Sequence, residues 1–205
     1  MGTKRDFIRE ELLVDKFMED ETNICHLEET EDSGRSVLEF ELNSDTNISI
    51  KNVDKKHTDM YFFQNSKAKS MFKRVDHIIF EHRPGDKWRV HLIEMKSTVG
   101  NGTWVEARGK FRASYLLTQA IAAMLDMEIE ETIMYTTYEK VDLSYKDTTP
   151  SARHMRVGEP SIRPEDEWNG GKFGLNFGER YSFIHKPIQM KRNDKDVLVG
   201  REVVS

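Results

Sequence analysis

The pattern of apolar and polar positions predicts two paired strands in the middle of the chain. The runs 75–81 and 87–96 are rich in β-branched and aromatic residues and are apolar on both faces, as in central strands covered on each side. Between them lie residues 83–86, with the sequence RPGD, which is typical of a tight turn. We therefore expect an antiparallel hairpin inside a larger sheet.

Helical periodicity and further alternation predict the elements around this hairpin. Apolar residues fall on one helical stripe in 4–19 and again in 104–127. Alternation predicts strands at 36–42, 47–52, 131–138, 181–189 and 196–204. The first two of these flank a short polar turn, so we expect them to form a hairpin. The glycine-rich segment 169–178 is typical of an ordinary connection, and a mobile loop that contacts substrate is the alternative.

The order of these elements indicates an α/β protein with a mixed central sheet flanked by helices. We expect one core domain over residues 1–140, and a C-terminal β-rich extension over 141–205 that packs on the same domain. A length of 205 residues is enough for a substantial hydrophobic core.

Composition excludes several classes of protein. Hydrophobic residues make up 37% of the chain and charged residues 33%, which favours a soluble folded protein over a disordered one. No run approaches the roughly 18 to 20 apolar residues of a membrane span, and the first residues lack the apolar centre of a signal peptide. We therefore expect a cytoplasmic location and no membrane partner. A lone Cys25 excludes disulfides and cysteine-rich metal sites.

Charge is distributed unevenly along the chain. The net charge of −5 argues mildly against a protein that coats nucleic acid. Residues 67–115, however, hold 11 Lys and Arg against 5 Asp and Glu, whereas residues 1–66 hold 8 against 16 and residues 116–205 hold 12 against 15. The basic middle of the chain is therefore the place to look for contacts with an anionic polymer.

The same basic segment contains a candidate catalytic cluster. Glu94 and Lys96 alternate along one strand, so their side chains point to the same face, and the hairpin turn brings Asp76 beside them. Burying a carboxylate in an apolar strand is costly unless it is paired or bound to metal, although a surface ion pair is the alternative interpretation. His77 and His91 have the opposite parity and are expected to be packed rather than catalytic.

Two carboxylates and a neighbouring carbonyl form an oxygen-only ligand set, which suits Mg²⁺ or Mn²⁺ rather than zinc. Such an ion can activate water and neutralise charge on a phosphodiester, and a nearby lysine adds positive charge for the phosphate oxygens. Hydrolysis of a phosphodiester bond uses all three groups together.

These residues resemble the PD-(D/E)xK nuclease superfamily. The likeness consists of Asp76, seventeen intervening residues, Glu94-Met95-Lys96, the following helix and the next strand, and it covers roughly residues 4–140. It implies a restriction-endonuclease-like α-β-β-β-α-β core. It also implies Asp76 and Glu94 as metal ligands, the backbone carbonyl of Met95 as a further ligand, and Lys96 as the catalytic lysine.

The sequence departs from the superfamily's pattern in two places. Val75 stands where the motif has proline, and the order Tyr115 then Gln119 reverses the Gln and Tyr that some exonuclease members carry. Many members add an acidic residue from the first helix. Here Glu10 or Glu11 could supply it, and Glu10 is favoured because it lies on the apolar stripe.

A polar stripe on the helix over 104–127 is a candidate nucleic-acid interface. Arg108, Arg112, Tyr115 and Gln119 share one face, and Lys110 lies nearby. Arginine forks bind phosphates and tyrosine can stack on a base, whereas an ordinary solvated helix face is the alternative.

The sequence therefore predicts a Mg²⁺- or Mn²⁺-dependent nuclease, an endonuclease with DNA preferred over RNA. Because one site cuts one strand, related folds are often dimers, and a homodimer is a further expectation. The alternative is a catalytically inactive nuclease-fold protein that binds nucleic acid or acts as a protein-assembly module. A phosphodiesterase for free nucleotides is a third candidate.

Overall fold

The computed structural model has a seven-stranded mixed sheet at its centre, and it describes residues 4, 8–13, 17–31, 34–50, 70–143 and 164–204. The strands are, in spatial order, β1 (Met18–Glu21), β4 (Asn47–Ile50), β5 (His77–Arg83), β6 (Lys87–Glu94), β8 (Glu128–Tyr138), β11 (Arg180–Gln189) and β10 (Lys172–Asn176). Neighbours from β1 to β6 are antiparallel, β8 is parallel to both β6 and β11, and β10 is antiparallel to β11.

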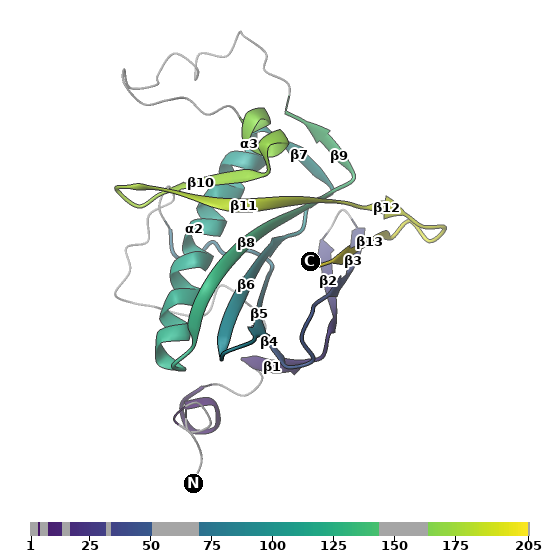
Figure 1. The fold of residues 1–205 in the computed structure, drawn as a ribbon. Coiled ribbons are helices and arrows are strands. Elements are labelled where there is room, and N and C mark those ends of the chain that lie inside the picture. The colour runs from purple at the N-terminus through teal and green to yellow at the C-terminus, as the bar shows by residue number, and fades with distance from the viewer. Residues whose placement is uncertain are drawn as a thin grey trace.

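A long helix, α2 (Asn101–Met124), covers one face of this sheet and connects the parallel strands β6 and β8 (Figure 1). Its buried residues are Trp104, Ala107, Phe111, Ala113, Ser114, Thr118, Ile121 and Ala122. Of these, Trp104, Ala107, Phe111, Ile121 and Ala122 belong to a core that includes Phe80, Val90 and Leu92 from the hairpin. The helix predicted over 104–127 is therefore confirmed. The apolar stripe expected on this helix consists of Ala113, Leu117, Ala120, Ile121 and Met124, and it is wrong in part, because Ala120 and Met124 are exposed.

The other face of the sheet is covered by a second, four-stranded sheet rather than by a helix (Figure 1). Its strands are, in spatial order, β12 (Lys191–Arg192), β13 (Leu198–Val203), β3 (Gly34–Glu41) and β2 (Ile24–Glu31). Leu38 and Phe40 from this sheet pack against Ile79, Ile93 and Tyr135 from the large sheet. The prediction of an α/β protein with a mixed sheet is confirmed, but helices on both faces are not, and the described residues are mostly β.

The remaining elements are short. A π-helical turn, η1 (Ile8–Leu12), precedes β1, and a helix α3 (Pro164–Gly170) lies before β10. The strands β7 (Thr98–Gly100) and β9 (Lys140–Asp142) form a parallel pair beside the start of α2.

Two predictions for the N-terminal part are wrong. The helix expected over 4–19 does not reach its predicted end, because residues from Met18 onward form β1; residues 5–7 and 14–16 lie outside the described residues. The ranges 36–42 and 47–52 do not form a hairpin. Most of the first range belongs to β3, which pairs with β2 and β13. The second range contains β4, which pairs with β1 and β5 in the other sheet.

The C-terminal strands are where alternation predicts them, at β11 and β13. The glycine-rich segment 169–178, expected to be a connection, instead contains β10, which forms the end of the large sheet. Strands from both ends of the chain thus complete the layers around the central hairpin.

Candidate active site

The β5–β6 hairpin positions the two candidate carboxylates side by side. Its turn contains Gly85 and Asp86 with positive φ angles of 80° and 55°, as the sequence RPGD predicts for a tight turn. The register pairs His77 with Ile93, so the next pair toward the open end of the hairpin is Asp76 and Glu94. Both have the parity of Ile78 and Leu92, which places them on the side of α2.

Four side chains meet at this end of the hairpin. The Nζ of Lys110, from α2, is 2.6 Å from Oε1 of Glu94 and 3.5 Å from Oδ1 of Asp76. The Nζ of Lys96 is 3.1 Å from the same Oε1 atom. The backbone N–H of Met95 donates to Oδ2 of Asp76 over 2.6 Å. The structure therefore brings Asp76, Glu94 and Lys96 together as predicted, and it adds Lys110.

The cluster is nearly closed to solvent. The side chain of Glu94 is 0% exposed, that of Asp76 is 7%, and those of Lys110 and Lys96 are 16% and 20%. Oε2 of Glu94 is buried and has no hydrogen-bond partner among the described residues. A buried carboxylate oxygen without a partner is costly, so it marks a place where a ligand would be stabilising.

Burial and like charge set the protonation of this cluster. Burial and the charge of Asp76 raise the pKa of Glu94 to about 7, against the opposing effect of Lys110 and Lys96. Burial acts to lower the pKa of Lys110, but the carboxylates of Glu94 and Asp76 outweigh it and raise that pKa above its usual value. Lys110 therefore stays positively charged.

Two hydroxyl groups that the sequence interpretation missed fix the backbone around the carboxylates. Thr137 Oγ1, on the neighbouring strand β8, accepts from the N–H of Lys96 over 2.8 Å and donates to its carbonyl over 3.1 Å. Ser114 Oγ, on α2, accepts from the N–H of Val75 over 2.9 Å. A hydroxyl facing a strand end is a weak sequence signal, since many Ser and Thr side chains have no such role.

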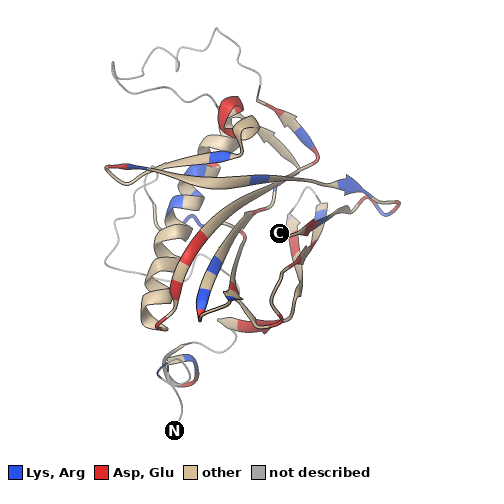
Figure 2. Cartoon of the chain, viewed as in Figure 1, with Lys and Arg blue, Asp and Glu red and all other residues tan. Residues whose placement is uncertain are grey.

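The predicted nucleic-acid stripe does not gather at this cluster. Arg108 bonds to the buried carboxylate of Glu167 over 3.2 Å and to the carbonyl of Gly174 over 2.8 Å. These bonds join α2 to α3 and β10, which is a structural role. The other members are Arg112, which is half-buried, Tyr115, whose ring packs against Phe177 and Phe183, and Gln119, which is exposed. The basic residues of α2 all lie in its N-terminal half (Figure 2).

The oxygen atoms at the hairpin end fit a divalent ion. Asp76, Glu94 and the predicted Met95 carbonyl are oxygen donors of the kind that Mg²⁺ and Mn²⁺ prefer, and two carboxylates suffice when waters complete the shell. Glu10, the expected third acid, has an exposed side chain in η1, and the side chain of Glu11 lies outside the described residues. Within the described part of the chain, no group of three or more His, Cys, Asp or Glu side chains could hold a metal.

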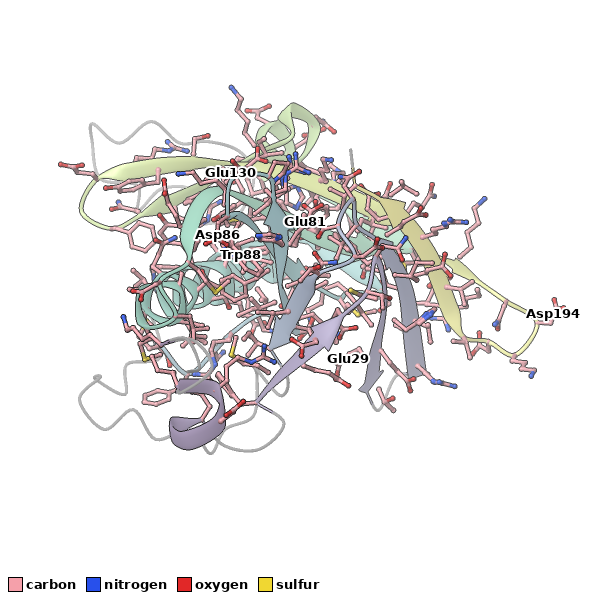
Figure 3. All side chains as sticks on the ribbon, turned by 60° about the horizontal axis from the view of Figure 1, so that its bottom comes forward. Glu29, Glu81, Asp86, Trp88, Glu130 and Asp194 are labelled. Carbon is pink, nitrogen blue, oxygen red and sulfur yellow. The ribbon has the colours of Figure 1, made fainter. Side chains whose placement is uncertain are left out.

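A second buried polar cluster lies on the opposite face of the same hairpin. Glu81 accepts a hydrogen bond from the N–H of Asn43 over 2.9 Å, and its Oε2 is 3.1 Å from Nε2 of His91. Nδ1 of His91 is 3.0 Å from the hydroxyl of Tyr135. Burial lowers the pKa of His91, so its neutral ring donates to Glu81 and accepts from Tyr135. Figure 3 shows Glu81 inside the molecule, whereas Asp194 lies at the tip of a projecting turn. His91 is packed, as predicted.

A surface hollow of about 390 Å³ lies at the turn end of the hairpin. It is lined by Asn43, Ser44, His82, Arg83, Pro84 and Gly85. This lining contains no carboxylate and no lysine, unlike the cluster at the other end of β5 and β6. The hollow and the candidate active site are therefore separate features.

No protein-family model, no curated protein and no solved structure matches this chain. Among the described residues, no helix has the length and apolar character needed to cross a membrane.

Proposed function

We propose that this protein is a divalent-metal-dependent nuclease that hydrolyses phosphodiester bonds in nucleic acid, preferring DNA to RNA. The observation that carries the proposal is the convergence of Asp76 and Glu94 with two lysines, in a cluster where Oε2 of Glu94 is buried without a partner. A carboxylate pair that only stabilised the fold would be expected to have all of its oxygens bonded.

The arrangement of the central elements supports a restriction-endonuclease-like core. Strands β4, β5 and β6 are successively antiparallel, α2 follows β6, and β8 returns parallel to it. This is the β-β-β-α-β order implied by the resemblance to PD-(D/E)xK nucleases. We propose that the four-stranded sheet takes the place of helices on the far face.

Each residue of the cluster has a role in this proposal. Asp76, Glu94 and the Met95 carbonyl would hold Mg²⁺ or Mn²⁺, which when bound supplies a Lewis acid for the phosphodiester. Lys96 is partly exposed, and its ammonium would stabilise negative charge on the phosphate oxygens. Ser114 and Thr137 would keep the backbone of both strand ends in place, which preserves the spacing of the charged groups.

One observation favours a second candidate function. The ammonium of Lys110 contacts both carboxylates, so the cluster has an internal counter-ion without any metal. A nuclease-fold protein that has lost catalysis could keep such a pair to stabilise its fold. It would then act as a nucleic-acid-binding or protein-assembly module.

Cleavage assays separate the two candidates. We expect labelled DNA to be cut in Mg²⁺ or Mn²⁺, RNA to be cut more slowly, and EDTA to abolish both activities. D76N and K96M should lower the rate by at least ~100-fold, because D76N weakens a metal ligand and K96M removes the ammonium that would stabilise charge on the phosphate. K73M is the matched control, since Lys73 pairs with Glu106 and is 57% exposed.

Circular dichroism must show that each variant is folded. If the folded parent cuts neither polymer, and calorimetry detects no Mn²⁺ site, the nuclease proposal is wrong and the inactive module is favoured. Equal rates for D76N, K96M and the parent would assign any observed activity to another site or to a contaminant.

A further inference from the structure

Lys110 was expected to contact nucleic acid, but its ammonium instead faces the two buried carboxylates. It lies on α2, three residues after buried Ala107 and four before buried Ser114, at the border of the helix face that packs on the sheet. Its side chain reaches one oxygen of Glu94 at 2.6 Å and one of Asp76 at 3.5 Å. It is therefore a bridging cation between the two carboxylates.

A divalent ion held by both carboxylates would need the space that this ammonium occupies. Mg²⁺ binds oxygen at about 2.0 to 2.1 Å, which is closer than an ammonium can approach. Two cations that share the same oxygens repel each other strongly in a nearly closed site. The bridging lysine and the ion therefore compete for one position.

We propose that Lys110 is an exchangeable counter-ion of the site, which neutralises Asp76 and Glu94 in the metal-free protein and is displaced when a divalent cation binds. This inference rests on the proposed function, because it assumes that the same carboxylates bind the metal. Lys110, which lies outside the motif formed by Asp76 and Glu94-Met95-Lys96, would then set the affinity of the site for the metal.

Lys110 is better suited to exchange than Lys96. The backbone of Lys96 is held at both its N–H and its carbonyl by Thr137, so its side chain begins from a fixed strand end beside Glu94. The ammonium of Lys110 instead bridges oxygens of both carboxylates, at 2.6 Å from Glu94 and 3.5 Å from Asp76, and rotation of its flexible side chain can move it away without moving α2. Displacement of Lys110 would free oxygens of both carboxylates.

Calorimetric titration with Mn²⁺ at one fixed pH tests the competition. K110M keeps most of the side-chain length but removes the charge, so we expect it to bind Mn²⁺ at least tenfold more tightly than the parent. K73M is the control. It also removes one lysine charge, from a lysine that pairs with Glu106 of α2, and it should bind Mn²⁺ within twofold of the parent.

Chemical labelling tests displacement itself, because removal of any nearby positive charge could raise metal affinity. The parent is treated with an amine-acylating reagent, and modification of each lysine is followed by mass spectrometry. Lys110 should react slowly without metal, and severalfold faster with saturating Mn²⁺, because its ammonium leaves the carboxylates for solvent. Labelling of Lys73 should not change and serves as the internal reference.

The outcomes distinguish the two proposals. If neither the parent nor K110M binds Mn²⁺, the proposed function fails and counter-ion exchange fails with it. If both bind with equal affinity, or if Mn²⁺ leaves the labelling of Lys110 unchanged, the exchange is wrong while the proposed function stands. Binding by K110M alone would also overturn the exchange, because Lys110 would then block the ion in the parent rather than be displaced by it.

Discussion

Glu81 and Glu94 lie on opposite faces of one hairpin, and both side chains are 0% exposed. Glu81 has a bond at each oxygen, from the N–H of Asn43 and from His91, and the guanidinium groups of Arg83 and Arg89 lie 3.7 and 3.6 Å away. Lys110 and Lys96 both contact Oε1 of Glu94, whereas its Oε2 has no hydrogen-bond partner among the described residues.

The carboxylates of Glu81 and Glu94 therefore have opposite electrostatic surroundings, although both are buried. Burial acts to raise the pKa of Glu81, but the bonds from His91 and Asn43 and the charge of Arg89 outweigh it and lower that pKa to about 2. At Glu94, burial and Asp76 prevail and raise the pKa to about 7. Burial alone does not distinguish the two glutamates, whereas the bonding of their oxygens and the charges around them do.

The largest expected effect is the loss of stability when Glu81 becomes neutral. E81Q keeps the shape of the side chain but leaves Arg83, Arg89 and His91 without the charge that they surround. We expect the free energy of unfolding to fall by about 3 kcal/mol at pH 7, as measured by urea denaturation. A loss below about 1 kcal/mol would show that the bonds around Glu81 do not need its charge.

Acid should remove the same stabilisation from the parent. The pKa of Glu81 is about 2 in the folded protein and near 4.5 in the unfolded chain, so the unfolded state binds the proton more readily between these values. Its contribution is fully present above about pH 5 and is lost as the pH falls toward 2, which amounts to about 3 kcal/mol. Urea midpoints measured between pH 6 and 3 should therefore fall more steeply for the parent than for E81Q. Parallel curves would contradict the lowered pKa.

The parts of the fold that sequence predicted are those fixed by local signals. The turn 83–86 and the long runs beside it specify the hairpin, and helical periodicity specifies α2. The pairing of β3 could not be read in this way. Its alternation suits a strand in either sheet, and its partner β13 comes from the other end of the chain. Packing between distant segments decided that pairing.

The candidate site was also predictable only where local signals specify it, which is within the hairpin. Strand alternation places Asp76, Glu94 and Lys96 together, because all three lie on one hairpin. Lys110 was predicted to contact nucleic acid. Its place beside the two carboxylates was missed, because its distance along the chain from Glu94 does not show which face of the helix packs on the sheet. The buried residues Trp104, Ala107, Phe111 and Ser114 define that face, and their bulk and spacing were the signal that could have placed Lys110 at its border.

The smallest expected effect is that of the matching substitution on the other face. E94Q removes a buried charge that lies beside Asp76, which is favourable, but it weakens the pairing with Lys110 and leaves an amide N–H₂ where Oε2 has no partner. These changes oppose each other, so we expect the free energy of unfolding to change by no more than about 1 kcal/mol. Urea denaturation of E81Q and E94Q under identical conditions measures the contrast directly. Equal losses would mean that Glu94 stabilises the fold as Glu81 does, and the unpartnered oxygen would then no longer favour a functional site.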